Sequence, residues 1–239
     1  MAVLQLLGWD FPPERAVAVA VELIDPVSGR ITSNGLTVTL QGRSSKPITS
    51  SSGRLVWIGD VENWPAALSV DCGAQPFQSI VNHSLIALRP ASWPKPKPHE
   101  RLIRVRLTPT SVYPFTDGVT AIQGWLFEND PPTPIADAEL SFEWAVAGTA
   151  AWQPIDPNLS VRTDNQGRFG VYARIRGTAA QEPDVAHGLV KIHIVVTRGA
   201  QTKRSPDTFQ FLPPPAATGR IPDGAPLPEW VALDWGVLV

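Results

Sequence analysis

The sequence is poor in cysteine, because Cys72 is the only one among 239 residues. A single thiol cannot form an intramolecular disulfide, and structural zinc sites need several cysteine or histidine ligands at short spacing. The sequence therefore excludes a disulfide framework and a cysteine-based zinc site. Cys72 ends the strand-like stretch 68–72, so we expect a small buried apolar residue rather than a nucleophile.

Long apolar runs and a strong net charge are also missing. The apolar segment within the first ten residues is too short for a signal sequence or a membrane span, and no basic residue precedes it. The formal net charge of −2 gives no long-range attraction to nucleic acid or to an anionic membrane. We expect cytoplasmic synthesis without a signal peptide, and no nucleic-acid or membrane partner. Residues 1–13 are expected to form an arm that docks either on its own domain or on a neighbouring subunit.

Catalytic motifs are a third absence. The sequence contains no GxSxG, HExxH, P-loop or GxGxxG pattern, and its four histidines do not have the spacing of metal ligands. We therefore expect no enzyme activity, no catalytic or metal-binding residue and no cofactor. One alternative concerns calcium, because Glu128, Asp130, Asp137 and Asp164 could gather at one end of a domain. Carboxylates that form turns explain the same residues equally well.

Proline, by contrast, is abundant, with 25 residues, and helix-favouring runs are scarce. Proline is excluded from helix interiors and from central strands, which favours short strands joined by proline-rich loops. The clearest turn-and-strand unit is 163–175. Its turn contains Asp164 and ends at Gly167, and then Phe169, Val171, Ala173 and Ile175 alternate with Arg168, Tyr172 and Arg174. An Asp side chain that bonds to its own backbone and a glycine at positive φ are typical of such a turn, and the alternation predicts a strand with one buried face.

A fainter copy of this unit occurs around Gly53, so the sequence predicts two tandem β-sandwich domains in an all-β chain. The expected parts are the arm 1–13, domain 14–108, linker 109–118, domain 119–212 and tail 213–239. In the first domain, the strand after Gly53 carries Leu55 and Trp57 on one face and Val56 and Ile58 on the other. A strand that is apolar on both faces is either covered on both or presents one face to a partner.

The second half resembles the carboxypeptidase regulatory-like (transthyretin-like) β-sandwich modules. The resemblance lies in the strand with Gly124, the approach 134–140 to the next strand, and the segment 163–169. It covers about 119–212, and residues 17–72 resemble a weaker version. Such modules serve as spacers, adhesion units and assembly modules. A two-domain example without a signal sequence is similar to small structural proteins of phage tails or tail-like contractile injection particles, and fold alone does not fix function.

The tail is the main candidate for partner binding. Three prolines follow residue 212, and the last eleven residues form a dense apolar block. Exposed to water, this block would drive association. We expect it to be an arm that docks on another protein subunit, although it could also fold back on its own chain. The residues expected to dock are Trp230, Val231, Leu233, Trp235, Val237 and Leu238.

Nine tryptophans are a second signal. Trp144 and Trp152 lie on a segment that the first domain lacks, and exposed tryptophans on a β-sandwich can form a platform for sugar rings. Trp57 and Trp125 have the phase of core residues. The sequence therefore predicts a structural or adaptor subunit of a large assembly, with a carbohydrate-binding or adhesion module as the alternative.

Overall fold

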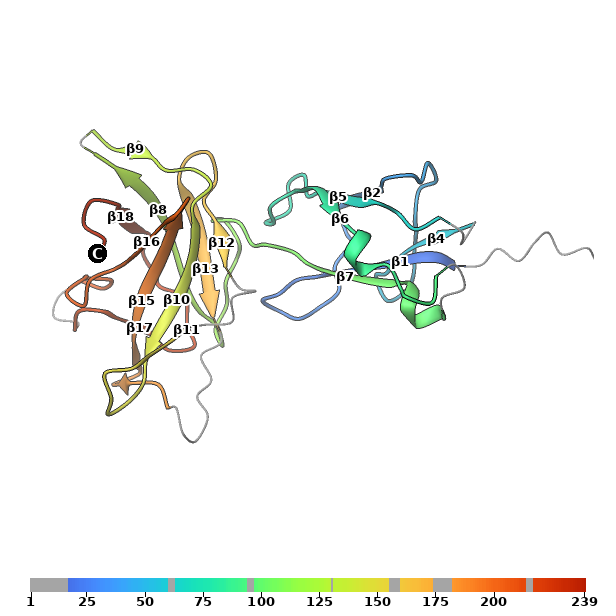
Figure 1. Ribbon diagram of the computed structural model, residues 1–239. Helices are drawn as coiled ribbons and strands as arrows, with labels where there is room; N and C mark the ends of the chain where they lie inside the picture. Colours follow the sequence, from blue (N-terminus) through green and yellow to red (C-terminus); the bar gives the residue numbers. More distant parts are fainter. Residues whose placement is uncertain are drawn as a thin grey trace, which may run out of the picture. The chain divides into compact units, whose positions relative to one another are not determined.

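The protein is described by a computed structural model, which covers residues 17–59, 63–93, 97–129, 131–154, 160–173, 182–213 and 217–239. Within these ranges the chain consists of strands and loops, with two short 3-10 helices at Ile86–Leu88 and Pro98–Arg101. It divides into two compact units, Met1–Leu107 (unit 1) and Thr108–Val239 (unit 2). The all-β fold class expected from the sequence is confirmed (Figure 1).

Unit 1 consists of two sheets. One has the strand order β3-β4-β1-β7 and the other has the order β2-β5-β6. All neighbours are antiparallel except β1 and β7, which run parallel. The strands are β1 (Val17–Ile24), β2 (Thr37–Leu40), β3 (Ile48–Thr49), β4 (Leu55–Ile58), β5 (Ala67–Asp71), β6 (Ile80–Ser84) and β7 (Leu102–Arg106).

The core of unit 1 follows the alternation of its strands. Val19, Val21 and Leu23 of β1 are completely buried, and Trp57 of β4 is buried beside them. Burying side chains of this size contributes about 1.5–3 kcal/mol each. The Trp57 indole N–H donates to the carbonyl of Ser45 at 3.0 Å, so its one polar group is satisfied.

A buried carboxylate lies on the opposite face of β1. Glu22 accepts hydrogen bonds from Nε of Arg54 at 2.6 Å and from Nε of Arg104 at 2.9 Å. Burial alone raises the pKa of Glu22, but the hydrogen bonds and positive charges of the two arginines hold it below its ordinary value. The ion pairs link β1 to β7 and to Arg54, the residue just before β4.

Unit 2 also consists of two sheets. The larger contains the path β11-β10-β15-β14, with β12 paired to β10 and with β16 and β17 paired to β15. The smaller has the order β13-β8-β18, with β9 paired to β8. The strands are β8 (Thr120–Glu128), β9 (Thr133–Pro134), β10 (Glu139–Ala145), β11 (Trp152–Pro154), β12 (Val161–Arg162), β13 (Arg168–Ala173), β14 (Val185–Ala186), β15 (Leu189–Arg198), β16 (Gln201–Arg204), β17 (Arg220–Pro222) and β18 (Val231–Asp234).

Both sheets of unit 2 contribute to one core. Ile122 and Leu126 of β8 lie in the same cluster of buried residues as Phe142 of β10 and Ile192 and Ile194 of β15. β13 adds Phe169, Val171 and Ala173, as its alternation predicts. Ile175 and Arg174 lie outside the described residues.

The segment expected to be a linker belongs to unit 2. Tyr113 is buried, and the ring of Phe115 lies 5.9 Å from that of Tyr172 on β13. Tyr172 was expected to face solvent, but this segment covers it. Gly170 permits the approach, because a Cβ there would lie 2.8 Å from the carbonyl oxygen of Thr110. The prediction of one exposed face on β13 is therefore wrong over this half of the strand.

Candidate binding surfaces

The two turns that stood out in the sequence form as expected. Oδ1 of Asp164 accepts hydrogen bonds from the backbone N–H of Gln166 at 2.8 Å and of Arg168 at 2.9 Å. Gly167 has φ of 72° and Gly53 has φ of 81°, which is the conformation that glycine adopts without strain. Ser50 Oγ takes the place of the carboxylate in the first unit and accepts from the N–H of Arg54. The predicted roles of Asp164, Gly167 and Gly53 are confirmed.

The C-terminal block folds back on its own unit. β18 pairs in parallel with β8, so that Val231 lies opposite Gly124 and Leu233 opposite Leu126. Val231, Leu233, Trp235 and Leu238 belong to the core cluster of unit 2. The proline-rich segment before β18 contributes buried Ile221 and Leu227 to the same core. The prediction of a free docking arm is therefore wrong, because alternate residues of the block match a free edge of the sheet of unit 2. Trp230 and Val237 remain about half exposed.

The expected sugar platform is not formed. Trp144 is 5% exposed and belongs to the core cluster, so it cannot bind a ligand at the surface. Trp152 is partly buried, and its ring stacks on that of His193 with 3.7 Å between centroids. Nε2 of His193 is 2.6 Å from Oδ1 of Asp207, and this hydrogen bond, together with the charge of Lys191, lowers the pKa of Asp207. The prediction of a platform that uses Trp144 is wrong.

The acidic residues considered for calcium have separate roles. Glu128 pairs with Arg198, and Asp137 with Arg162, at 2.7 and 2.9 Å, while Asp164 caps its turn. Asp130 lies outside the described residues. In the part of the chain that the structure describes, no group of three or more acidic, histidine or cysteine side chains could hold a metal ion.

Cys72 is buried, and its thiol donates to the carbonyl of Gln78. Burial raises the pKa of Cys72. A thiol with a raised pKa is a poor nucleophile, so a structural position fits this residue.

Two other tryptophans border a hollow on the outer face of the smaller sheet of unit 2. Trp125, Gln166, Arg168 and Trp230 line this hollow, of about 430 Å³, which we call the aromatic hollow. Trp125 is 37% exposed and Trp230 is 48% exposed. Trp125 pairs with Arg168 on one side and with Ala232 on the other. The hollow thus combines two exposed indoles with a guanidinium and an amide.

Three distant segments meet at the aromatic hollow because two glycines let them approach. A Cβ on Gly124 would collide with the carbonyl oxygen of Val231, so only glycine lets β18 lie beside β8 here. A Cβ on Gly167 would collide with the carbonyl oxygen of Leu126, and the Gly167 carbonyl accepts from the Leu126 N–H at 2.8 Å. The contact at Gly124 brings Trp230 beside Trp125, and the contact at Gly167 brings the turn that contains Gln166 to the same hollow.

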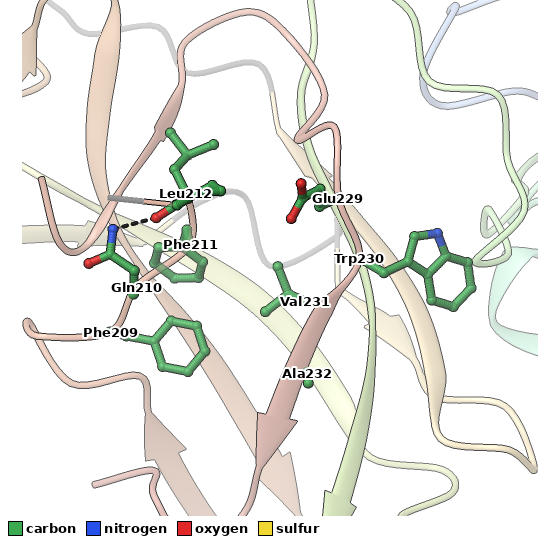
Figure 2. Close-up of a pocket in the computed structure, with 9 residues that line it drawn as sticks. Phe209, Gln210, Phe211, Leu212, Glu229, Trp230, Val231 and Ala232 are labelled. Carbon is green, nitrogen blue, oxygen red and sulfur yellow. Dashed lines mark hydrogen bonds between the residues drawn. The ribbon is translucent and has the colours of Figure 1, made fainter. Parts of the chain in front are cut away.

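A separate groove of about 330 Å³ lies on the other side of Trp230. Figure 2 shows Phe209 and Phe211 facing Val231 across it, while the indole of Trp230 points away from them. The side chain of Gln210 donates to the carbonyl of Leu212 within the same segment. Phe211 and Val231 belong to the core, so the groove lies over core residues, between the segments 209–213 and 229–232.

Unit 1 exposes an apolar surface on the sheet β3-β4-β1-β7. Val17, Ile48 and Ile58 are 41%, 57% and 38% exposed. Val56 of β4 lies opposite Ile48 of β3 on one side and opposite Ala20 of β1 on the other. An irregular register between Val17 and Val19 places Val17 opposite Ile58. We call Val17, Ile48, Val56 and Ile58 the unit 1 apolar face. The second face of β4, which the sequence left open between burial and partner contact, is thus partly exposed.

The sequence interpretation missed the role of Trp125, which was assigned to the core. Ile122, Gly124 and Leu126 are buried on one face of β8, so Trp125 has the opposite phase, together with Gln123 and Phe127. That phase was visible in the sequence. The position of Trp230 beside it was not, because it depends on pairing between strands more than 100 residues apart.

Comparisons with known proteins identify no relative. No protein-family model and no curated protein matches the chain. A solved structure described as a streptococcal ancillary pilin aligns with a TM-score of 0.25 and 12% identity, covering 90% of this chain and 60% of that chain. None of the described helices is long and apolar enough to span a membrane.

Proposed function

We propose that the chain is a non-enzymatic structural or adaptor subunit of a larger protein assembly, and that it binds another subunit through the unit 1 apolar face. The observation that carries the proposal is the group of exposed Val and Ile side chains on adjacent strands. Contiguous apolar patches on a sheet are typical of protein contacts, since their burial stabilises the complex.

The surroundings of this face indicate the chemistry of the partner. Next to Ala20 and Val56, the same side of β1 carries Glu22 with Arg54 and Arg104. The arginine side chains are 45% and 68% exposed, and the three groups together carry one net positive charge. A protein surface with an apolar centre and an acidic margin is therefore complementary to it.

The class of assembly follows from the resemblance to carboxypeptidase regulatory-like modules. Because such modules serve as spacers and assembly modules, that resemblance supports a phage tail or a tail-like contractile injection particle. The partner in this proposal is a second subunit of the same particle. The proposal assigns no catalytic residue, cofactor or metal to the chain.

Sedimentation of the full chain from the cells that produce it tests the proposal. The double variant Ile48→Glu/Ile58→Glu places two charges on the unit 1 apolar face, whereas Val81→Glu alters a still more exposed apolar residue on the other sheet of the same unit. We expect the wild type and Val81→Glu to sediment with a large particle, and the double variant to stay near the top of the gradient.

The melting temperature distinguishes binding of a partner to the unit 1 apolar face from burial of that face by residues of the same chain. Substitutions of exposed residues usually change stability by less than about 0.5 kcal/mol, so the purified double variant should melt as the wild type does. A double variant that sediments normally but melts at a lower temperature would show that residues of the same chain cover this face. Wild-type protein found only as free monomer would also refute the proposal.

A further inference from the structure

We propose that the aromatic hollow of unit 2 binds acidic glycans, with pyranose rings stacked on Trp125 and Trp230 and a sugar carboxylate bound by Arg168. This site lies in a different unit from the unit 1 apolar face and does not depend on the function proposed for that face. It also differs from the platform expected at Trp144 and Trp152, which the structure does not form.

The two indoles provide the stacking surface. More than a third of each residue's surface is exposed, and both line the hollow. The ring of Phe127 lies 4.8 Å from that of Trp125, which supports Trp125 from its own strand. A tryptophan that is already ordered loses little conformational entropy on binding, because it has only two side-chain torsions. The C–H-rich faces of pyranose rings pack on such flat aromatic surfaces.

The two polar side chains at the hollow determine the class of ligand. Arg168 and Gln166 bond through their backbone N–H groups to Asp164, and neither side chain has a hydrogen bond or ion pair to another described residue. With respect to the described part of the chain, the Arg168 guanidinium therefore offers five donors and a positive charge that no carboxylate pairs with. Guanidinium groups bind carboxylates through two parallel hydrogen bonds, and a uronic or sialic acid supplies a carboxylate at the edge of the ring. The Gln166 amide can donate to and accept from hydroxyl groups.

Proline-rich peptides also bind aromatic-lined grooves. They are neutral unless they carry acidic residues, so they leave the charge of Arg168 unpaired. None of the described residues that line the hollow is aliphatic, and its mixture of two indoles with charged and amide groups matches a sugar acid better. We therefore assign the glycan and use the peptide as a competing probe.

Titration of the full chain, followed by tryptophan fluorescence, tests this assignment. The probes are hexagalacturonate, a hyaluronan hexasaccharide and sialyllactose, with cellohexaose as the neutral control and a proline decapeptide as the competing class. We expect at least one acidic probe to bind about tenfold or more tightly than cellohexaose, as a bidentate charged contact provides.

Substitutions locate the binding. Trp230→Leu and Arg168→Gln should each weaken binding of the acidic probe by about tenfold. Trp152→Leu is the matched control and should bind within about twofold of the wild type, because Trp152 stacks on His193 away from the hollow. Binding is measured at a temperature at which the melting curve of every variant shows it to be folded.

Several results would overturn the assignment. These are a wild-type chain that binds none of the acidic probes at millimolar concentration, equal affinity for cellohexaose, tighter binding of the proline decapeptide, or unchanged affinity in Trp230→Leu. Loss of binding in Trp152→Leu alone would place the site on the larger sheet instead. This test does not use sedimentation of the particle. A failure of the glycan assignment can therefore be distinguished from a failure of the proposed function.

Discussion

Substitution of Gly124 by alanine should detach or displace the C-terminal strand. A Cβ at this position would collide with the carbonyl oxygen of Val231, would lie 3.1 Å from the carbonyl carbon of Val231 and would lie 2.8 Å from Cζ of Phe169. Carbon and oxygen ordinarily approach to about 3.3 Å. The φ angle of Gly124 is outside the left-handed region, so the effect of the methyl group arises from this contact rather than from backbone strain.

The magnitude follows from what β18 buries. Overpacking a tight site usually costs about 1–3 kcal/mol, and complete detachment would expose four core side chains at about 1.5–3 kcal/mol each. The carbonyl of Val231 is backbone and cannot rotate away as a side chain could, so β18 must move. We expect a loss of about 3 kcal/mol, which lowers the melting temperature of a unit this size by about 10 °C.

Calorimetry, with hydrogen exchange of the peptide that contains β18, measures this effect. Gly236→Ala is the matched control, because Gly236 also lacks a positive φ and its nearest neighbours are side-chain atoms of Asp234, at 3.3 Å and beyond. Both substitutions share the entropic gain of replacing glycine in the unfolded chain. If the two variants differ by less than about 0.5 kcal/mol, the close approach of β18 to β8 is not as described.

The remaining predictions concern the turns, the buried carboxylate and the tail. Gly167→Asn should lose at least about 2 kcal/mol because its Cβ meets backbone, whereas Gly53→Asn should lose about 1 kcal/mol or less, as urea unfolding of each variant will show, and equal losses would contradict this. Glu22 has a folded pKa below its ordinary 4.5, so the stability that it contributes is present above about pH 4.5 and fades as the pH falls through the folded pKa. The difference in unfolding free energy between wild type and Glu22→Gln should be about 1 kcal/mol at pH 7 and should shrink toward pH 3. A difference that stays constant with pH would refute this prediction. Deletion of residues 229–239 should abolish the unfolding transition of unit 2 in calorimetry, because four core side chains are removed. An unchanged transition would instead support the interpretation of this block as a free docking arm.

Local chemistry made the turns predictable. The hydrogen bonds of Asp164 reach only two and four residues along the chain, and the positive φ of Gly167 belongs to the same turn. Such features are determined by neighbouring residues, which a sequence displays directly. The collision that a side chain at Gly167 would make with Leu126 is different, because it joins segments about 40 residues apart. The sequence therefore indicated why a glycine fits the turn but not why asparagine should be a poor substitute.

The sequence alone could not show whether the C-terminal block pairs with a sheet of its own unit or with that of a neighbour. Val231 and Leu233 alternate as residues of a strand would, and such a strand can complete its own sheet or that of a neighbour. The choice depends on whether β8 has a free edge with room for it, and Gly124 provides that room. The aromatic hollow is a consequence of the same pairing, so a prediction that left the block unpaired could not place Trp230 beside Trp125.

In unit 1, the first and last strands are parallel neighbours, and this arrangement has a mechanical consequence. The chain enters at the start of β1 and leaves at the end of β7. Tension on the two ends of the unit therefore pulls these strands past each other lengthwise, and the evenly spaced bonds of a parallel ladder bear the load together. The ion pair of Glu22 with Arg104 spans the same two strands. Opening the unit requires the whole ladder to shear at once, so a chain held at both ends resists force through its unfolding rate rather than through its equilibrium stability.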